Sequence, residues 1–491
     1  MKKSLLAVLL ILVVVLFLVL VRTARHTPHQ VASISRIEIA LDEGLIATHL
    51  AEAVQIPTVS YGNPDQIEPE AFEEFIAWVA TTYPEVSRSM TGTRHGGYTM
   101  LYRWAGQNEA LAPILLTGHY DVVPVIPGTE RLWNHPPFAG QIVDRVIWGR
   151  GALDDKSAVI AQLEAATGLL KAGYQPDRTV YFSFGHDEEL GGFKGAASVA
   201  AYLRSEGVQL AWSLDEGSFL LDGMLPGVEP LLASINVAEK GSLSLEIVAT
   251  SPGGHSSMPP RQTAVGHLAE AINKLDAHPI PGGLTGLSLE MFDVVSRHMP
   301  FGSRIFFANQ WLFGDLVEDQ LSATTFGNAM LRTTTAATML SASIKVNVLP
   351  IEAIATVNFR LHPRDTVEGV VEFVKSIVEN ERIEVRQASS FSRPASNVSN
   401  SDSAGYKAIE RAVREIYGEV IVAPGLMVAG SDSRHYGKVA DNSFRFNPMI
   451  VGPDDLTGFH GTNEKISVHD LAEATRTYTQ IIRHGTSDTS Q

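Results

Sequence analysis

The pattern of apolar and polar positions divides most of the chain into two kinds of region. Short, continuous apolar runs of the buried-strand type occur at 113–116, 179–184, 210–214 and 444–451, and a helical repeat of apolar positions covers 156–171. Strands that alternate with helices are typical of an α/β fold, so we expect a mostly parallel central sheet. An acidic residue, Asp154 or Asp155, stands where a side chain caps the predicted helix.

The pattern changes between residues 236 and 400. Apolar residues alternate with mostly polar neighbours, as in a strand with one wet face, at Leu243, Leu245, Ile247 and Ala249. Further elements are expected at 263–275 (helix), on both sides of 347–350 (strands), at 367–378 (helix) and at 383–386 (strand). This β-α-β-β-α-β order predicts a ferredoxin-like domain at 236–400, inserted into an α/β catalytic domain that occupies 34–235 and 401–485. The stretch from 280 to 335 fits no regular element of this plan.

The N-terminal region is apolar without interruption from residue 5 to residue 21, after Lys2 and Lys3. At ~1.5 Å per helical residue this run covers roughly 26 Å, close to a ~30 Å hydrocarbon core. We predict a single-pass transmembrane anchor at 1–25, with the catalytic domain outside the cytoplasm. The alternative is a cleaved signal peptide, although Arg22-Thr23-Ala24-Arg25 is a poor cleavage site.

Composition excludes several classes of protein. The chain has 38 Lys and Arg against 54 Asp and Glu, a net charge of −16, which argues against nucleic-acid binding because phosphates require a basic face. It has no cysteine, so disulfides, thiol nucleophiles and thiolate metal ligands are excluded. Any metal must therefore be held by histidine and carboxylate side chains.

Polar clusters accompany the predicted strands and the helix of the α/β region, at 117–121, 149–156, 185–189, 215–217 and 458–464. Because ligands of open α/β sheets bind outside the carboxyl ends of the strands, we expect these clusters to converge in one crevice. Each cluster alone has a simpler explanation, such as a helix cap or a solvated acidic pair. Together they concentrate negative charge that a divalent cation would neutralise. Histidine and carboxylate without thiolate suit Zn²⁺, with Mn²⁺ or Co²⁺ as substitutes.

Several motifs carry a family resemblance. They are Gly-His-Tyr-Asp-Val-Val-Pro at 118–124, Gly-Arg-Gly-Ala-Leu-Asp-Asp-Lys at 149–156, Asp-Glu-Glu at 187–189, Gly-Gly-His-Ser-Ser at 253–257 and the loop around His460. The sequence, from about residue 40 to 485, resembles the di-zinc peptidase family of aminoacylase-1, succinyl-diaminopimelate desuccinylase and carboxypeptidase S. Within it, the branch of Gly-X carboxypeptidase and N-fatty-acyl-amino-acid synthase/hydrolase is the most similar.

The resemblance implies two zinc ions and a role for each motif residue. Asp154 would bridge the ions, His119 and Asp215 would complete one site, and Glu189 and His460 the other. Glu188 would be the general base, and Asp121 would orient the His119 ring. Glu216 is a rival to Asp215, and a cis peptide bond after Asp154 is usual in the family.

The resemblance also implies substrate contacts. His255 would stabilise the oxyanion, often from the partner subunit of a homodimer, so the inserted domain would act as a lid and in dimerisation. Asn347 and Arg360 would hold carboxylate and carbonyl groups, and Arg434 competes as the carboxylate anchor. The simpler interpretation of these residues is that they are polar groups in turns or on exposed strand faces.

The resulting hypothesis is a zinc hydrolase that cleaves the amide bond N-terminal to a free amino-acid carboxylate. Its substrate would be a short peptide or an N-acyl amino acid. The hypothesis allows a long acyl chain and a reversible reaction. Large apolar residues between 291 and 313 either pack within the insert or form an acyl-chain wall. The competing hypothesis is a membrane-tethered binding or scaffold protein without activity, which the complete set of ligands and base argues against.

Overall fold

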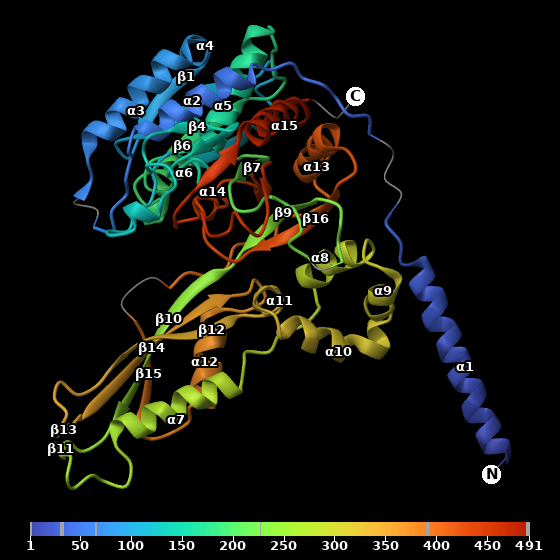
Figure 1. The fold of residues 1–491 in the computed structure, drawn as a ribbon, viewed down its shortest axis with the longest axis vertical. Helices are drawn as coiled ribbons and strands as arrows, with labels where there is room; N and C mark the ends of the chain where they lie inside the picture. Colours follow the sequence, from blue (N-terminus) through green and yellow to red (C-terminus); the bar gives the residue numbers. More distant parts are fainter. Residues whose placement is uncertain (1, 30–33, 64–65, 226, 389–391, 488–491) are drawn as a thin grey trace. The chain divides into compact units, whose positions relative to one another are not determined.

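The computed structural model describes residues 2–29, 34–63, 66–225, 227–388 and 392–487, which form two compact units (Figure 1). The α/β unit comprises Thr27–Val237, Val294–Pro300 and Ser399–Gln491. The inserted unit comprises Met1–His26, Ala238–Asp293 and Phe301–Val398. The apolar N-terminal segment therefore groups with the insert, which the sequence did not predict.

The sheet of the α/β unit has the order β1-β2-β6-β3-β7-β17-β9-β8-β18, with β16 paired to β9. Its strands are β1 (Thr91–His95), β2 (Thr99–Trp104), β3 (Ile114–His119), β6 (Val180–Gly185), β7 (Trp212–Asp215), β8 (Leu220–Leu221), β9 (Leu232–Glu239), β16 (Ile421–Met427), β17 (Ser443–Arg445) and β18 (Ile450–Val451). The four strands β6, β3, β7 and β17 are parallel neighbours, whereas β1, β2 and β9 pair antiparallel. The edge strands β8 and β18 also pair parallel, but the sheet as a whole is mixed and the expectation of a mostly parallel sheet is not confirmed. The antiparallel edge arises because Gly96 and Gly97 both adopt positive φ and connect β1 to β2 in a hairpin.

The helices of this unit are α2 (Glu43–Gln55), α3 (Pro69–Thr82), α4 (Pro84–Ser89), α5 (Lys156–Lys171), α6 (Ala196–Ser205), α13 (Ala404–Tyr417), α14 (Ser433–Tyr436) and α15 (Val468–Thr486). The helix α5 has the bounds that the apolar repeat predicted, and it packs between β3 and α15. A small sheet of β4 (Gln141–Val143), β5 (Val146–Trp148) and β19 (Lys465–Ser467) joins two distant loops. Because β5 precedes the 149–155 loop and β19 follows the 460–464 loop, their pairing brings these loops together.

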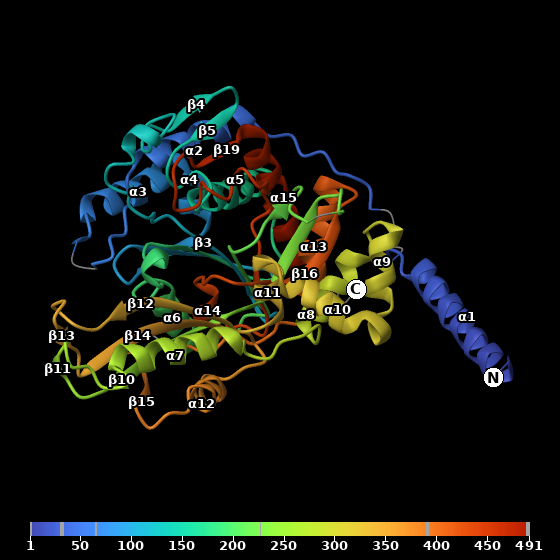
Figure 2. The same ribbon diagram turned by 60° about the horizontal axis from the view of Figure 1, so that its bottom comes forward.

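The inserted unit contains an antiparallel sheet of order β12-β14-β10-β15. Its elements follow the chain as β10 (Gly241–Thr250), α7 (Ala264–Ala277), β12 (Thr334–Ser341), β14 (Glu352–Leu361), α12 (Val367–Ile377) and β15 (Ile383–Gln387), the β-α-β-β-α-β order that the pattern predicts. Alternate residues such as Leu245 and Val357 face α7 and α12, which cover the same side of the sheet (Figure 2). Burial of this one face explains the period of two in the sequence.

The stretch that fitted no regular element is helical. It forms α8 (Leu287–Ser296), α9 (Phe301–Ala308), α10 (Gln310–Ser322) and α11 (Thr325–Leu331). The helix α1 (Lys2–Arg25) packs against α9. The strands β11 (Gly254–His255) and β13 (Val348–Leu349), which are distant in the chain, pair antiparallel in a separate two-stranded sheet, and β13 precedes β14.

Candidate active site

The carboxyl ends of neighbouring parallel strands carry the first group of candidate residues. His119 is the last residue of β3, and Glu216 directly follows β7. The His119 Nδ1 lies 3.0 Å from the backbone carbonyl of Asp121, so its N–H donates there. The Nε2 lone pair then faces Asp154 Oδ1 at 3.2 Å and Glu216 Oε1 at 3.5 Å, the orientation of a metal ligand.

Asp154 lies between two histidines. Its Oδ1 faces His119, and its Oδ2 lies 3.2 Å from Nε2 of His460. The same His460 nitrogen lies 3.2 Å from Glu189 Oε2. The chain thus forms two three-residue groups, His119–Asp154–Glu216 and Asp154–Glu189–His460, whose ligand atoms lie within 4.8 Å of one another in each group. One carboxylate shared between the two groups is the arrangement that two neighbouring metal ions require.

Asp215, which the sequence favoured as a ligand, belongs to neither group among the described residues. Its Oδ1 accepts the backbone N–H of Glu216 at 2.9 Å, and its Oδ2 accepts that of Ser433 at 2.6 Å. Asp215 is the last residue of β7, and Glu216, one position later, faces His119 instead. The rival residue Glu216 is therefore the better candidate for the first group.

A buried ion pair fixes the loop that carries Asp154. Glu464 Oε1 accepts the backbone N–H groups of Gly151, Leu153 and Asp154 at 2.9–3.0 Å. Its Oε2 accepts Arg150 Nη1 at 2.7 Å, and both side chains are almost fully buried. Charge-assisted hydrogen bonds of this kind are short and directional, so Glu464 positions Asp154 without facing either metal group. The loop that carries Glu464 also contains His460, whose φ of 55° is a left-handed conformation uncommon for histidine.

Asp121 organises the residues of the next loop. Its Oδ1 accepts the N–H of Glu188 at 3.2 Å, and its Oδ2 accepts that of Glu189 at 3.2 Å and the Ser60 hydroxyl at 2.7 Å. Glu188 is buried beside this carboxylate, and its Oε1 accepts Arg434 Nη2 at 3.1 Å. Glu188 therefore carries the features of a positioned acid–base group, and Arg434 lies against it.

The pKa values of the site residues are shifted because several carboxylates are buried close together. Burial raises the pKa of Glu188 well above its usual value, and the charges of Glu189 and Asp121 add to the rise. Burial also raises the pKa of Glu216 well above the usual value and that of Glu189 to a lesser extent. Burial alone would lower the pKa of His119. The carboxylates of Glu216, Asp121 and Asp154 outweigh burial and raise this pKa well above its usual value. Hydrogen bonds to Asp154 and Glu189 raise the pKa of His460 to about 10.

These residues fit divalent metal ions. The donor atoms are imidazole nitrogens and carboxylate oxygens, and Glu189 Oε1 is buried with no hydrogen-bond partner among the described residues. Such an orphaned oxygen costs free energy unless a cation or water satisfies it. A cation at each group would satisfy it and neutralise the carboxylates that otherwise hold protons.

The Asp154–Asp155 peptide bond is cis, as the family resemblance implied. Asp155 stands at the N-cap of α5, but its side chain makes no capping hydrogen bond. Its Oδ2 accepts the backbone N–H of His119 at 3.3 Å, and its Oδ1 accepts Asn447 Nδ2 at 2.7 Å. Asp155 therefore supports the strand end that bears His119 instead of capping the helix.

The remaining predicted residues lie in the inserted unit. His255 is exposed on β11, and its Nδ1 lies 2.8 Å from the Ser257 hydroxyl. His255 pairs with Val348, so the pairing of β11 with β13 brings His255 next to Asn347. The Asn347 Oδ1 is buried without a partner among the described residues. Arg360 is exposed near the other end of β14, about 26 Å along that strand from Glu352 at ~3.3 Å per residue. His255 and Asn347 therefore form one group, and Arg360 stands apart from them.

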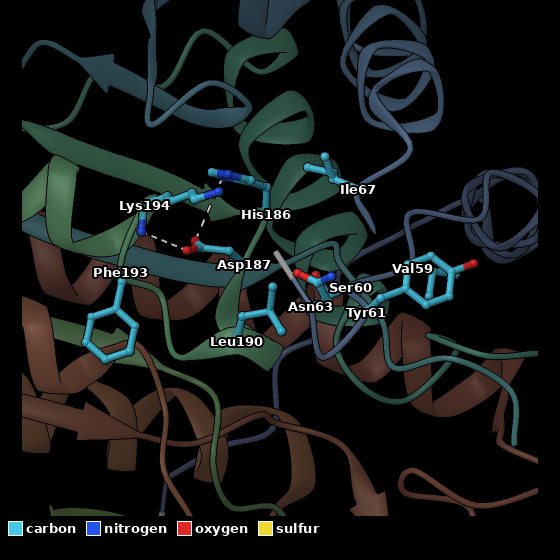
Figure 3. A pocket seen from close by; sticks show the side chains of 10 residues that line it. All are labelled: Val59, Ser60, Tyr61, Asn63, Ile67, His186, Asp187, Leu190, Phe193 and Lys194. Atoms are coloured by element: carbon cyan, nitrogen blue, oxygen red, sulfur yellow. Dashed lines mark hydrogen bonds and ion pairs between the residues drawn. The ribbon is translucent and has the colours of Figure 1, made fainter. Parts of the chain in front are cut away.

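A small pocket of about 100 Å³ lies in the α/β unit between the segment 59–67 and the loop 186–194 (Figure 3). Its lining is mostly apolar and consists of Val59, Ser60, Tyr61, Asn63, Ile67, His186, Asp187, Leu190, Phe193 and Lys194. The Asp187 carboxylate accepts the backbone N–H groups of Lys194 and Gly195, which fixes the loop at one wall. The Ser60 hydroxyl links the other wall to Asp121.

Sequence reasoning missed the supporting residues Ser60, Glu464 and Asn447. Each acts through a hydrogen bond to a residue that is distant in the chain, and single side chains of these types carry no signal of their own. Glu464 alone could have been found, because it ends the polar cluster that begins at residue 458.

Comparisons with known proteins place the chain among peptidases. A family model described as peptidase family M20/M25/M40 matches residues 115–484. The chain is 36% identical to "Probable carboxypeptidase S-like 2" of Dictyostelium discoideum, over 96% of this chain and 92% of that protein. It is 37% identical to "N-fatty-acyl-amino acid synthase/hydrolase PM20D1" of Xenopus tropicalis, over 99% of this chain and 96% of that protein.

Solved structures share the fold. An M20 family metallo-carboxypeptidase from Sulfolobus solfataricus superposes with a TM-score of 0.64 at 18% identity, covering 90% of this chain and 99% of that one. Human carnosine dipeptidase 1 superposes with a TM-score of 0.60 at 17% identity, covering 90% and 96%. At these identities the likeness concerns the fold alone.

Proposed function

We propose, from the premise that the chain belongs to peptidase family M20/M25/M40, that it hydrolyses the amide bond N-terminal to a free amino-acid carboxylate. Membership of this family makes the chain a metallopeptidase-type enzyme, which leaves no support for the inactive scaffold. The observation that carries the proposal is Asp154, whose two oxygens face His119 and His460 from opposite sides.

The proposed cofactor is a pair of Zn²⁺ ions, with Mn²⁺ or Co²⁺ as substitutes. His119, Asp154 and Glu216 would hold one ion, and Asp154, Glu189 and His460 the other. When bound, such ions supply Lewis acidity, which polarises the scissile carbonyl and makes water a stronger acid.

Glu188 is the proposed general base. It takes a proton from the attacking water and delivers it to the leaving amine, a task suited to a carboxylate whose pKa has been raised toward neutrality by burial. Arg434 limits this rise, because its guanidinium lies 3.1 Å from the Glu188 carboxylate. Asp121 holds the Glu188 and Glu189 backbone and accepts the His119 ring N–H, so it positions base and ligand together.

The proposed substrates are N-acyl amino acids or short peptides. The names of the relatives divide between carboxypeptidase and N-fatty-acyl-amino acid synthase/hydrolase, which supports both classes and, for the second, a reversible reaction. The substrate carboxylate would be held by Arg360 or Arg434, of which Arg434 lies beside Glu188. The apolar pocket between Val59 and Phe193 is a candidate for an apolar part of the substrate.

A homodimer is part of the proposal. His255 and Asn347 lie near the start of β14, where β11 pairs with β13, and Arg360 lies near the end of β14. His255 and Arg360 of the same chain are therefore too far apart to contact one small substrate together. The outer strand β12 has exposed apolar residues, with Met339 67% and Leu340 69% exposed, and such an edge is a template for pairing with a second chain. The partner subunit would then supply the oxyanion donor His255.

The N-terminal helix is proposed as a membrane anchor with the enzyme outside the cytoplasm. The helix α1 has a mean hydropathy of 3.5 over its most apolar window, and 6% of that window is buried. A signal sequence near the N-terminus would have the same properties.

The test is a substrate panel with metal titration. Metal-free protein should recover hydrolysis of N-acyl-phenylalanines and dipeptides on addition of two equivalents of Zn²⁺. A rise in kcat/KM with acyl length identifies an N-acyl-amino-acid hydrolase, and a preference for dipeptides identifies a carboxypeptidase. Hydrolysis of neither class by zinc-loaded protein would contradict the proposed function.

A further inference from the structure

The carboxyl end of the helix α1 is bound to the junction between α9 and α10. The Asn309 side chain at this junction donates to the Val19 carbonyl at 3.3 Å and contacts the Thr23 hydroxyl at 3.1 Å. The Arg22 guanidinium donates to the Ala308 carbonyl at 3.1 Å. Val19, Thr23 and Asn309 are all buried. The α9–α10 junction is therefore fixed beside the last turns of α1.

The rest of α1 carries exposed apolar side chains. Between Leu5 and Leu18 the large apolar residues are exposed, apart from the partly buried Val15. If this helix crosses a bilayer, its apolar run ends at Val21, so the segment from Val19 to Thr23 lies where hydrocarbon meets headgroups. The α9–α10 junction, which is bonded to that segment, lies at the same depth.

Large apolar side chains are exposed on both sides of this junction. Phe306 near the end of α9 is 39% exposed, and Trp311 and Leu312 in the first turn of α10 are 54% and 46% exposed. Leu316, one turn later, is 46% exposed. We call these four residues the apolar corner. Aromatic and leucine side chains of this kind are enriched where a protein meets the interface of a bilayer.

We propose that the apolar corner inserts into the headgroup layer of the bilayer that α1 crosses, so that the inserted unit is attached to the membrane at two points. This inference rests on the proposed membrane anchor. The basic residues nearby suit lipid phosphates: Arg22 and Arg25 end α1, and Arg304 Nη1 donates to the His26 carbonyl at 3.1 Å. Asp315 is exposed beside Leu316 and belongs among the headgroups, and Asp319, exposed one turn further along α10, confines insertion to the first turns of that helix.

The absence of cysteine makes a direct test available, because one introduced cysteine gives one labelled site. The full chain carrying Trp311→Cys, Leu312→Cys or Phe306→Cys is spin-labelled, reconstituted into phosphatidylcholine vesicles and exposed to oxygen and to a polar nickel chelate. Leu45→Cys, on the helix α2 of the α/β unit and 47% exposed, is the matched apolar control. Leu12→Cys reports on the anchor itself. Hydrolytic turnover of each unlabelled variant shows that it has folded.

The proposal expects labels at 306, 311 and 312 to be relaxed by oxygen several-fold more than by nickel, relative to the label at 45. Lipid exposure at 12 with aqueous exposure at all three corner positions would overturn the proposal and leave the anchor intact. Aqueous exposure at 12 as well would overturn the anchor and the proposal together. Protection of the corner from both reagents would show that protein covers it, a second copy for example, which also overturns the proposal.

Discussion

The two units keep their candidate functional residues in opposite environments. In the α/β unit, Asp154, Glu188 and His119 are enclosed by other charged groups, and almost every carboxylate oxygen faces a donor or a histidine. In the inserted unit, His255 and Arg360 are exposed, and large apolar residues such as Trp311 and Met339 face solvent. Enclosed charge is what metal chemistry requires, whereas exposed groups are suited to meeting a second surface. The difference suggests that one unit holds the reaction and the other holds the contacts.

The largest expected effect comes from removing the carboxylate that both metal groups share. Asp154→Ala should lose both metal ions and with them the hydrolytic activity, because neither group keeps three ligands. At metal concentrations about 100-fold above Kd, binding stabilises the wild type by about 2.7 kcal/mol, so the Tm difference between metal-loaded and chelated protein should vanish in the variant. Metal content by mass spectrometry and calorimetric Tm are the measurements. Asp402→Asn, at a highly exposed aspartate, is the control and should change neither.

Glu188→Gln separates the base from the metal ligands. The amide keeps the shape of the side chain but accepts no proton, so turnover should fall by a factor of at least ~10² while metal content stays unchanged. Glu189→Gln, its neighbour, should lose metal because Glu189 faces His460. Near-wild-type kcat in Glu188→Gln would refute the assignment of the base.

The inserted unit should contribute to the stabilisation of the oxyanion through His255. Loss of a single oxyanion donor costs about 10²–10³ in kcat, so His255→Ala should be strongly impaired with its metal intact. Co-expression of His255→Ala and Glu188→Gln chains tests the homodimer, since one wild-type site forms if His255 acts across subunits. A verified mixed dimer without activity would exclude donation across the interface.

The sequence predicted some elements of the two units and not others. The ligand motifs were recognisable because His119 ends a strand and Glu189 lies in the short turn that follows the next strand, and the alternation around Leu245 predicted the insert's sheet. The sequence alone does not choose between Asp215 and Glu216, because which of two adjacent acids faces His119 depends on the N–H groups of Glu216 and Ser433, and Ser433 lies more than two hundred residues away. The sequence did not predict the helices α8–α11, whose apolar residues lack a single buried face because several of them remain exposed.

The smallest effect near neutral pH concerns the stability of the inserted unit, because this effect develops only as the pH falls. Burial, reinforced by Arg364 and Lys240, lowers the pKa of His362 to about 3. Because the unfolded chain binds this proton near pH 6.5 and the folded chain does not, stability should decrease as pH falls from about 6.5 to 3, by up to ~1.4 kcal/mol per pH unit. Hydrogen exchange of the β14 amides at a series of pH values measures this stability, and His362→Gln should weaken its dependence on pH. His278→Gln, at an exposed histidine of the same unit, should leave it unchanged.

The central claim is that two metal ions share Asp154 in the α/β unit. Anomalous diffraction at the zinc absorption edge, from crystals of zinc-loaded full-length protein, tests it most directly. The account predicts two peaks bridged by the Asp154 carboxylate, one also bound by His119 and Glu216 and the other by Glu189 and His460. A single peak, or two peaks without Asp154 between them, would contradict it, and a first ion bound by Asp215 in place of Glu216 would overturn the ligand set proposed from the geometry.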